Sequence, residues 1–284
     1  MHESFLAYRR FQYLKLSLGL ILLSVLGYAL HDPSEPPSGS TWLGYTLGTL
    51  GGLLILWLLW FGVRKRQYHS RLGQVSGWLS GHVYLGSALL VIATLHCGFQ
   101  FGWNVHTLAY VLMAVVIASG FYGVFAYLRY PTRLTQNRGG LQVEAMLSEI
   151  ADLDRQCLVI ADHIGDKVHQ IMLRSIERTS FGGSLWKNPL PGIEKGVEEL
   201  NNELNQSTVF FMADQLASGQ SGARAEQVRR LLDLITSKKA LVTRVQEDRK
   251  YHALMKVWLY LHVPLSIALL AALIAHVISV FFYW

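Results

Sequence analysis

The chain has 284 residues, of which 51% are hydrophobic and 15% are charged, and its formal net charge is +6. Soluble domains have about 25% charged residues, so this composition excludes an ordinary soluble protein and indicates long apolar segments. With only two cysteines and no CxxCH motif, the chain excludes a four-cysteine iron–sulfur cluster and covalently attached c-type haem.

Five apolar segments are each about 20 residues or longer, which is enough to cross a bilayer core of about 30 Å. They cover residues 11–30, 42–63, 79–103, 107–129 and 257–283. The predicted fold is therefore an all-α membrane protein with five transmembrane helices. In the second segment Gly44, Gly48 and Gly52 form a small-xxx-small pattern, which fits either close helix packing or ordinary glycine content.

Lysine and arginine gather on one side of these segments, whereas the connections at 31–41 and 104–106 contain neither residue. Cytoplasmic flanks collect positive charge. We therefore expect the N-terminus and the long connection at 131–256 to be cytoplasmic, and the C-terminus to be periplasmic. Because topology explains the basic runs, we expect membrane lipid and no nucleic acid as a partner.

The predicted domains are a membrane domain at 1–130 with the first four spans, a cytoplasmic helical insertion at 131–256, and the fifth span at 257–284. Apolar residues at heptad-like positions predict that the insertion begins with an amphipathic helix of a coiled-coil-like hairpin. These residues are Val143, Leu147, Ile150, Cys157, Ala161, Ile164, Val168 and Ile171. Asp154 interrupts the series.

After a break rich in Gly and Pro, a second helix is predicted over about Ile193–Ala217. A third begins near Ala223 and continues into the fifth span, because Gly and Pro are absent from 223–263. The insertion contains no phosphate-binding loop and no nucleophile motif, so we expect it to dock a partner rather than to carry chemistry.

Two spans carry histidines, although polar side chains in lipid are costly and mark functional sites. His82 and His96 lie fourteen positions apart in the third span, and His262 and His276 are fourteen apart in the fifth. Fourteen residues are close to four helical turns, so each pair shares a face and is separated by about 21 Å. Both spans begin on the cytoplasmic side. The predicted pairs are therefore His82–His262 at the inner level and His96–His276 at the outer level.

Two facing imidazoles in an apolar slot can hold the iron of a b-type haem as axial ligands. The sequence therefore predicts two haem b groups in a dihaem bundle. Small residues nearby are expected to leave room for the macrocycles: Gly86, Ser87, Ala88, Ser266, Ala271 and Ala272. A carbonyl freed by Pro264 is expected to bond the second ring nitrogen of His262. His106, at an outer span end, is expected to lie at the interface or to line an outer pocket.

At these four histidines the chain resembles the dihaem cytochrome b superfamily of respiratory membrane subunits, in which histidines spaced 13 or 14 apart on two helices hold two stacked haems. The resemblance covers the spans but not residues 131–256, and the chain lacks a Pro-Glu-Trp-Tyr quinol motif. It implies an electron-transfer subunit of an oxidoreductase complex in the bacterial inner membrane. Electrons would pass between a cytoplasmic iron–sulfur protein, flavoprotein or quinone partner and a periplasmic redox partner such as cytochrome c.

Two alternatives stay open. One is a quinol-oxidising or quinone-reducing anchor subunit, with quinone as a further cofactor. The other, from a different class, is a histidine-bearing proton or ion transporter. Asp and Glu are absent from 42–130 and 257–284, which disfavours a proton path. The direction of electron flow is not fixed by these residues.

Overall fold

The structure is a computed structural model, and it describes residues 4–31, 37–67, 73–138, 141–179 and 222–282. The chain divides into two compact units. The first contains residues 1–125 and 258–284, and the second contains residues 126–257. Across the described ranges every regular element is helical.

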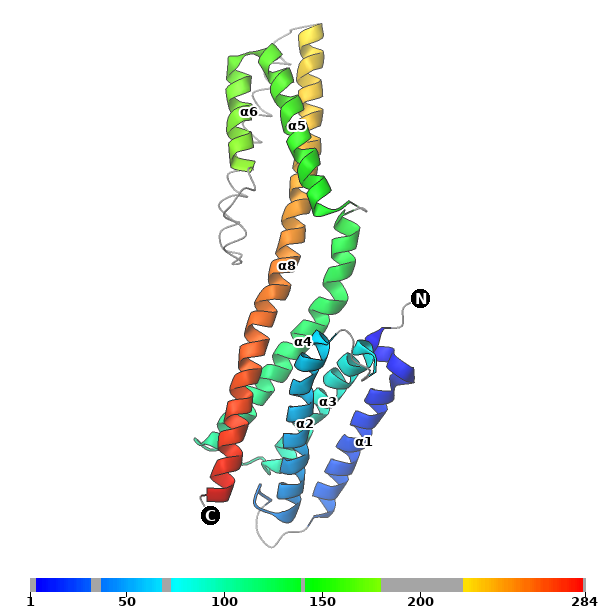
Figure 1. The fold of residues 1–284 in the computed structure, drawn as a ribbon, viewed down its shortest axis with the longest axis vertical. Coiled ribbons are helices and arrows are strands. Elements are labelled where there is room, and N and C mark those ends of the chain that lie inside the picture. The colour runs from blue at the N-terminus through cyan, green and yellow to red at the C-terminus, as the bar shows by residue number, and fades with distance from the viewer. Residues whose placement is uncertain (1–3, 32–36, 68–72, 139–140, 180–221, 283–284) are drawn as a thin grey trace. The chain divides into compact units, whose positions relative to one another are not determined.

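Five helices in the described ranges are long and apolar enough to cross a membrane. A short 3-10 turn, η1 (Phe5–Ala7), precedes the first of them. The five are α1 (Tyr8–Leu30), α2 (Trp42–Arg66), α3 (Val75–His96), α4 (Val105–Arg138) and α8 (Ala223–Phe282) (Figure 1). Large apolar side chains such as Leu22, Leu53 and Phe281 are exposed on them, as lipid-facing positions require. The predicted all-α, multi-pass membrane fold is confirmed.

The third span ends earlier than predicted. α3 ends at His96, whereas the apolar segment continues to residue 103. The backbone turns at Gly98 and Phe99, whose φ angles of +57° and +61° lie in the left-handed region and stop the helix. His96 is therefore the last residue of α3, next to the loop that leads to α4.

In the first unit, α3 packs closely against both α1 and α2. Glycines allow this approach: a Cβ on Gly77 would lie 2.7 Å from Cζ of Tyr8, and one on Gly81 would lie 2.8 Å from Cη2 of Trp57. In the described part of the chain, α8 makes no comparably close backbone approach to α3. Side chains join the two helices instead, since Leu89 of α3 and Leu269 of α8 belong to one buried apolar cluster.

α4 and α8 contact each other through Trp258. Its indole covers Gly123 of α4 so tightly that a side chain at Gly123 has no room. The indole N–H also donates a hydrogen bond of 2.7 Å to the backbone carbonyl of Ser119. This contact fixes α8 against α4 one helical turn before His262.

In the second unit, α5 (Val143–Ile164) and α6 (Asp166–Thr179) pack against the first part of α8 (Figure 1). The prediction of one helix through Ile171 is wrong at Gly165, which separates α5 from α6. Its φ of +146° is unfavourable for other residues, and its N–H caps the carbonyl of Ala161. The apolar pattern continues beyond Gly165 because Val168 and Met172 of α6 pack in the same buried cluster as residues of α5.

Asp154, which interrupts the apolar series, forms an ion pair with Lys238 of α8 at 2.6 Å. The side chains of Asp154 and Lys238 are 14% and 10% exposed, so both charged groups are largely shielded from water. A buried carboxylate requires such a partner. The interruption therefore marks a specific polar contact between α5 and α8 within an otherwise apolar core.

The predicted second helix, Ile193–Ala217, and the Gly/Pro-rich break before it lie outside the described residues. The third helix is confirmed, because α8 begins at Ala223 and continues to Phe282. The boundary between the two units falls after Phe125 in α4 and after Val257 in α8. The predicted domain boundaries at 130/131 and 256/257 fall in the same helices.

Candidate functional site

The four histidines predicted as ligands lie on α3 and α8, two on each helix. The ring centroids of His96 and His276 are 6.0 Å apart, with an interplanar angle of 81°. His82 and His262, the other predicted pair, lie on the same two helices. The structure thus brings the rings of His96 and His276 together.

His96 is held by α2. Its Nδ1 lies 2.7 Å from the backbone carbonyl oxygen of Gly44. A carbonyl only accepts hydrogen bonds, so we assign the Nδ1–H tautomer, which leaves the lone pair of the ring on Nε2. A Cβ on Gly48 would lie 2.6 Å from Cε1 of His96, closer than real contacts allow. Gly44 and Gly48 of the small-xxx-small pattern therefore have a specific role: one bonds the ring of His96 and the other leaves room for it. A Cβ added to Gly52 would meet no atom within 4 Å.

His262 is held by α4. Its Nδ1 lies 2.7 Å from Oγ of Ser119, and the same hydroxyl donates to the carbonyl of Val116 at 2.7 Å. Because a hydroxyl has one proton, Oγ accepts from His262, and the lone pair of that imidazole is again on Nε2. The expectation that a carbonyl freed by Pro264 holds this ring is wrong, since the partner is Ser119.

The indole of Trp258 lies beside His262, with ring centroids 5.4 Å apart. It also bonds the backbone of Ser119, so the three residues form one connected contact between α4 and α8.

His82 differs from the other three. Its ring lies 5.1 Å from that of Phe61 and near the backbone carbonyl of Leu58. Its Nδ1 is buried without a hydrogen-bond partner. His82 therefore lacks the Nδ1 acceptor that orients His96 and His262.

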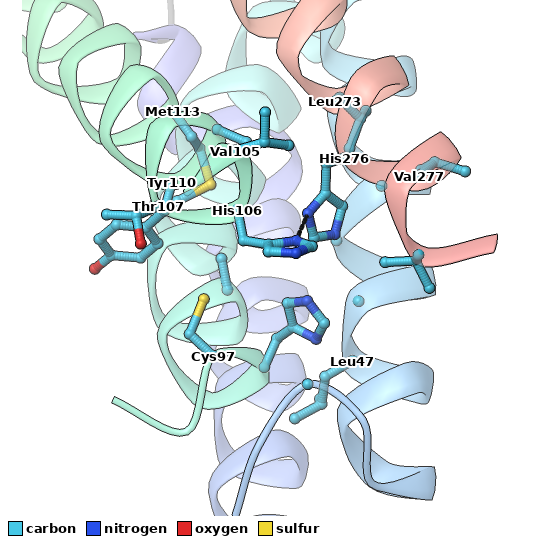
Figure 2. A pocket seen from close by; sticks show the side chains of 18 of the residues that line it. Leu47, Cys97, Val105, His106, Thr107, Tyr110, Met113, Leu273, His276 and Val277 are labelled. Carbon is cyan, nitrogen blue, oxygen red and sulfur yellow. Dashed lines mark hydrogen bonds between the residues drawn. The ribbon is translucent and has the colours of Figure 1, made fainter. Parts of the chain in front are cut away.

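His276 contacts His106, which was expected at the interface or in an outer pocket. Its Nδ1 lies 2.6 Å from Nδ1 of His106, and the two rings are nearly perpendicular at 87°. His106 comes from α4 and points at His276, which comes from α8 (Figure 2). His106 lines the outer pocket, which is one of the two positions expected for it, and it also contacts His276 directly.

Residues of α2, α3, α4 and α8 line a cavity of about 1080 Å³, and His96 is one of them. His106 and His276 also line it (Figure 2). Its walls are mainly apolar, with Leu47 of α2, Met113 of α4 and Leu273 of α8 among them. Ligand pockets have volumes of about 300–1,000 Å³, so this cavity has the volume of a small-molecule site.

The small residues expected to make room do not line this cavity. Among them, Ala88 is fully buried in a cluster with α2 side chains, including Leu43 and Leu47. The room comes instead from Gly48, Gly51 and Gly52 of α2 and from alanines on α3 and α4. The sequence did contain this signal, in the glycine ridge of the second span.

The described histidines do not form a compact metal-binding cluster. Within the described ranges no group of three or more His, Cys, Asp or Glu is arranged to hold a metal ion. Two imidazoles on opposite sides of one metal, each bonded at about 2 Å, have ring centroids about 6 Å apart. The 6.0 Å separation of His96 and His276 matches that requirement. At the outer pair the separation of the two rings therefore meets one requirement of a bis-histidine site.

The fold is that of a multi-pass helical membrane protein, with four histidines on α3 and α8 and a further one, His106, on α4. No family model, curated protein or solved structure matches the chain.

Proposed function

We propose that this protein is a b-type dihaem cytochrome that carries electrons across the membrane. One observation supports it above the others. Two of the four intramembrane histidines, His96 and His262, donate Nδ1–H to an acceptor of the protein. Each of these rings therefore has its lone pair on Nε2. Metal-binding histidines donate the N–H of their other ring nitrogen in this way, because the hydrogen bond fixes the tautomer and the ring orientation.

The chain's own residues would perform three tasks. His82 and His262 would hold one haem, and His96 and His276 the other. Gly44 and Ser119 would keep two of these rings in the ligand tautomer, while the apolar walls exclude water. A haem with two histidine ligands supplies one-electron chemistry and has no open coordination position, which suits electron transfer.

The spacing of the pairs suits transfer across a bilayer. Fourteen residues of helix separate the two levels by about 21 Å, so each pair would lie in a different leaflet. In the orientation proposed from the basic flanks, His82 and His262 are nearer the cytoplasm. An electron donor or acceptor there, such as an iron–sulfur protein, a flavoprotein or a quinone, would connect to a periplasmic redox partner through the two sites.

The competing class is a histidine-bearing transporter, and a visible spectrum of the purified protein separates the two. We expect a reduced α band of b haem and about two haems per chain by pyridine haemochrome. A chain without haem would favour the transporter.

The pairing is tested by single substitutions. His82→Ala and His262→Ala should remove one redox component, whereas His96→Ala and His276→Ala should remove the other. Loss of the same component in His82→Ala and His276→Ala would show that the pairing is wrong.

The orientation is tested by topology reporters fused at the N-terminus and after Gly219. Both should report the cytoplasm. A periplasmic signal after Gly219 would show that the orientation is the reverse. His82 and His262 would then lie nearer the periplasm.

A further inference from the structure

His106 lies in the first turn of α4, and that turn is anchored firmly. The side chain of Asn104 caps the helix by accepting a hydrogen bond of 2.9 Å from the N–H of Thr107. The hydroxyl of Thr107 in turn accepts from the N–H of Gly102 at 3.1 Å. The backbone that carries His106 is therefore fixed on both sides of it.

The contact of His106 with His276 is a hydrogen bond and leaves no room for a metal ion. The two Nδ1 atoms are 2.6 Å apart. A metal between two imidazole nitrogens would need about 4 Å, since each bond is about 2 Å long. His106 and His276 thus do not form a ligand pair through these atoms, whereas His96 lies at a suitable separation from His276.

One of the two nitrogens must donate and the other must accept. If His276 binds iron through Nε2, its proton is on Nδ1, and His276 is the donor. His106 then accepts at Nδ1 and, as a neutral ring, carries its own proton on Nε2. His106 would have the same role for His276 that the Gly44 carbonyl has for His96 and that Ser119 has for His262.

We propose that His106 is a positioning residue: it accepts the Nδ1 proton of His276 and thereby fixes that ring as the outer haem ligand. This inference rests on the proposed function. An acceptor at Nδ1 makes an imidazole a more basic ligand, which stabilises ferric over ferrous iron. Removing the acceptor should therefore raise the midpoint potential of the outer component.

The test compares three variants of the full-length protein by spectroscopic redox titration. His106→Asn retains an acceptor, because Oδ1 of asparagine occupies the place of Nδ1. His106→Leu fills the volume without an acceptor, and His106→Gln places its acceptor one bond further out. The inner component, held by His82 and His262, reports whether each variant is folded.

We expect His106→Leu and His106→Gln to favour the ferrous form of the outer component by about tenfold, which is 59 mV for one electron. His106→Asn should stay within about threefold of the wild type. Loss of the outer haem in the leucine variant, with retention in the asparagine variant, would support the same role. If the leucine variant fails to fold, the comparison of asparagine with glutamine decides.

Two results would overturn the inference without affecting the proposed function. In one, all variants keep the wild-type potential. In the other, His106→Asn loses the outer haem as completely as His276→Ala does, which would make His106 itself a ligand. A wild-type protein without any haem would instead overturn the proposed function, and this inference with it.

Discussion

Gly48→Ala should displace the ring of His96, whereas Gly52→Ala, one turn further along α2, should not. The added Cβ at position 48 would lie 2.6 Å from Cε1 and 2.8 Å from Nδ1 of His96. Carbon atoms pack at about 3.5 Å or more, so the ring must move by roughly 0.9 Å. At position 52 an added Cβ meets no atom within 4 Å.

The magnitude follows from three contributions. Overpacking costs roughly 1–3 kcal/mol. A ring displaced by roughly 0.9 Å also loses the 2.7 Å hydrogen bond to the Gly44 carbonyl, since hydrogen bonds rarely exceed about 3.2 Å. Loss of that bond costs about 1 kcal/mol or more. Alanine restores about 1 kcal/mol of helix propensity. The destabilising contributions are larger, so we expect Gly48→Ala to lower the free energy of unfolding by roughly 1–3 kcal/mol.

The assay is thermal denaturation of both variants in the same detergent, followed by redox titration. Gly52→Ala should melt at or slightly above the wild-type midpoint and keep both components. Gly48→Ala should melt lower and weaken or lose the outer component, while the inner one persists. Equal midpoints and equal haem content in the two variants would refute the close contact between α2 and His96.

Three further changes test other parts of the structure. Ser119→Ala should lower the affinity for the inner haem by roughly 10–100-fold, because His262 loses its Nδ1 acceptor. An unchanged affinity for the inner haem would contradict this. Asp154→Leu alone should cost roughly 3 kcal/mol, since it leaves Lys238 buried and unpaired, and the double change with Lys238→Leu should recover most of that loss in thermal denaturation; an equally unstable double variant would argue against it. Burial raises the pKa of the Cys157 thiol from 9.0 to about 11, so its thiolate fraction at pH 8 is about 100-fold below that of an ordinary thiol. Iodoacetamide labelling followed by mass spectrometry should be correspondingly slow in the folded chain and normal in the unfolded chain; equal rates would show that the thiol is accessible. The stability linked to that buried thiol is fully present below about pH 9 and is lost as the pH rises towards 11.

The local properties of the chain could be predicted well from the sequence. Hydropathy identified the five long helices, because a membrane span must be both apolar and about 20 residues long. The fourteen-residue spacing places the two histidines of each span on one face of its helix, because helix periodicity converts a sequence interval into a direction and a height. The helix that continues from Ala223 into the last span followed from the absence of Gly and Pro.

The interhelical contacts could not be predicted in the same way. Ser119 and His262 are 143 residues apart in sequence, and His106 and His276 are 170 apart. No periodicity relates such positions, because their distance depends on how α4 and α8 rotate and slide against each other. The early end of α3 was missed for a different reason. Hydropathy continues past His96, whereas the backbone stops at a left-handed turn.

The walls of the cavity come from distant parts of the chain, and this affects how the protein is made. Residues from Ser38 to Met113 supply three walls, and the fourth begins at Leu269. At about 5–20 residues per second, the roughly 150 residues between them take on the order of ten seconds to synthesise. During that interval His96 and His106 have no partner on α8, and the cavity lacks its fourth wall. Any group that this site holds must therefore enter after the last helix is inserted, or wait on an incomplete surface until that helix arrives.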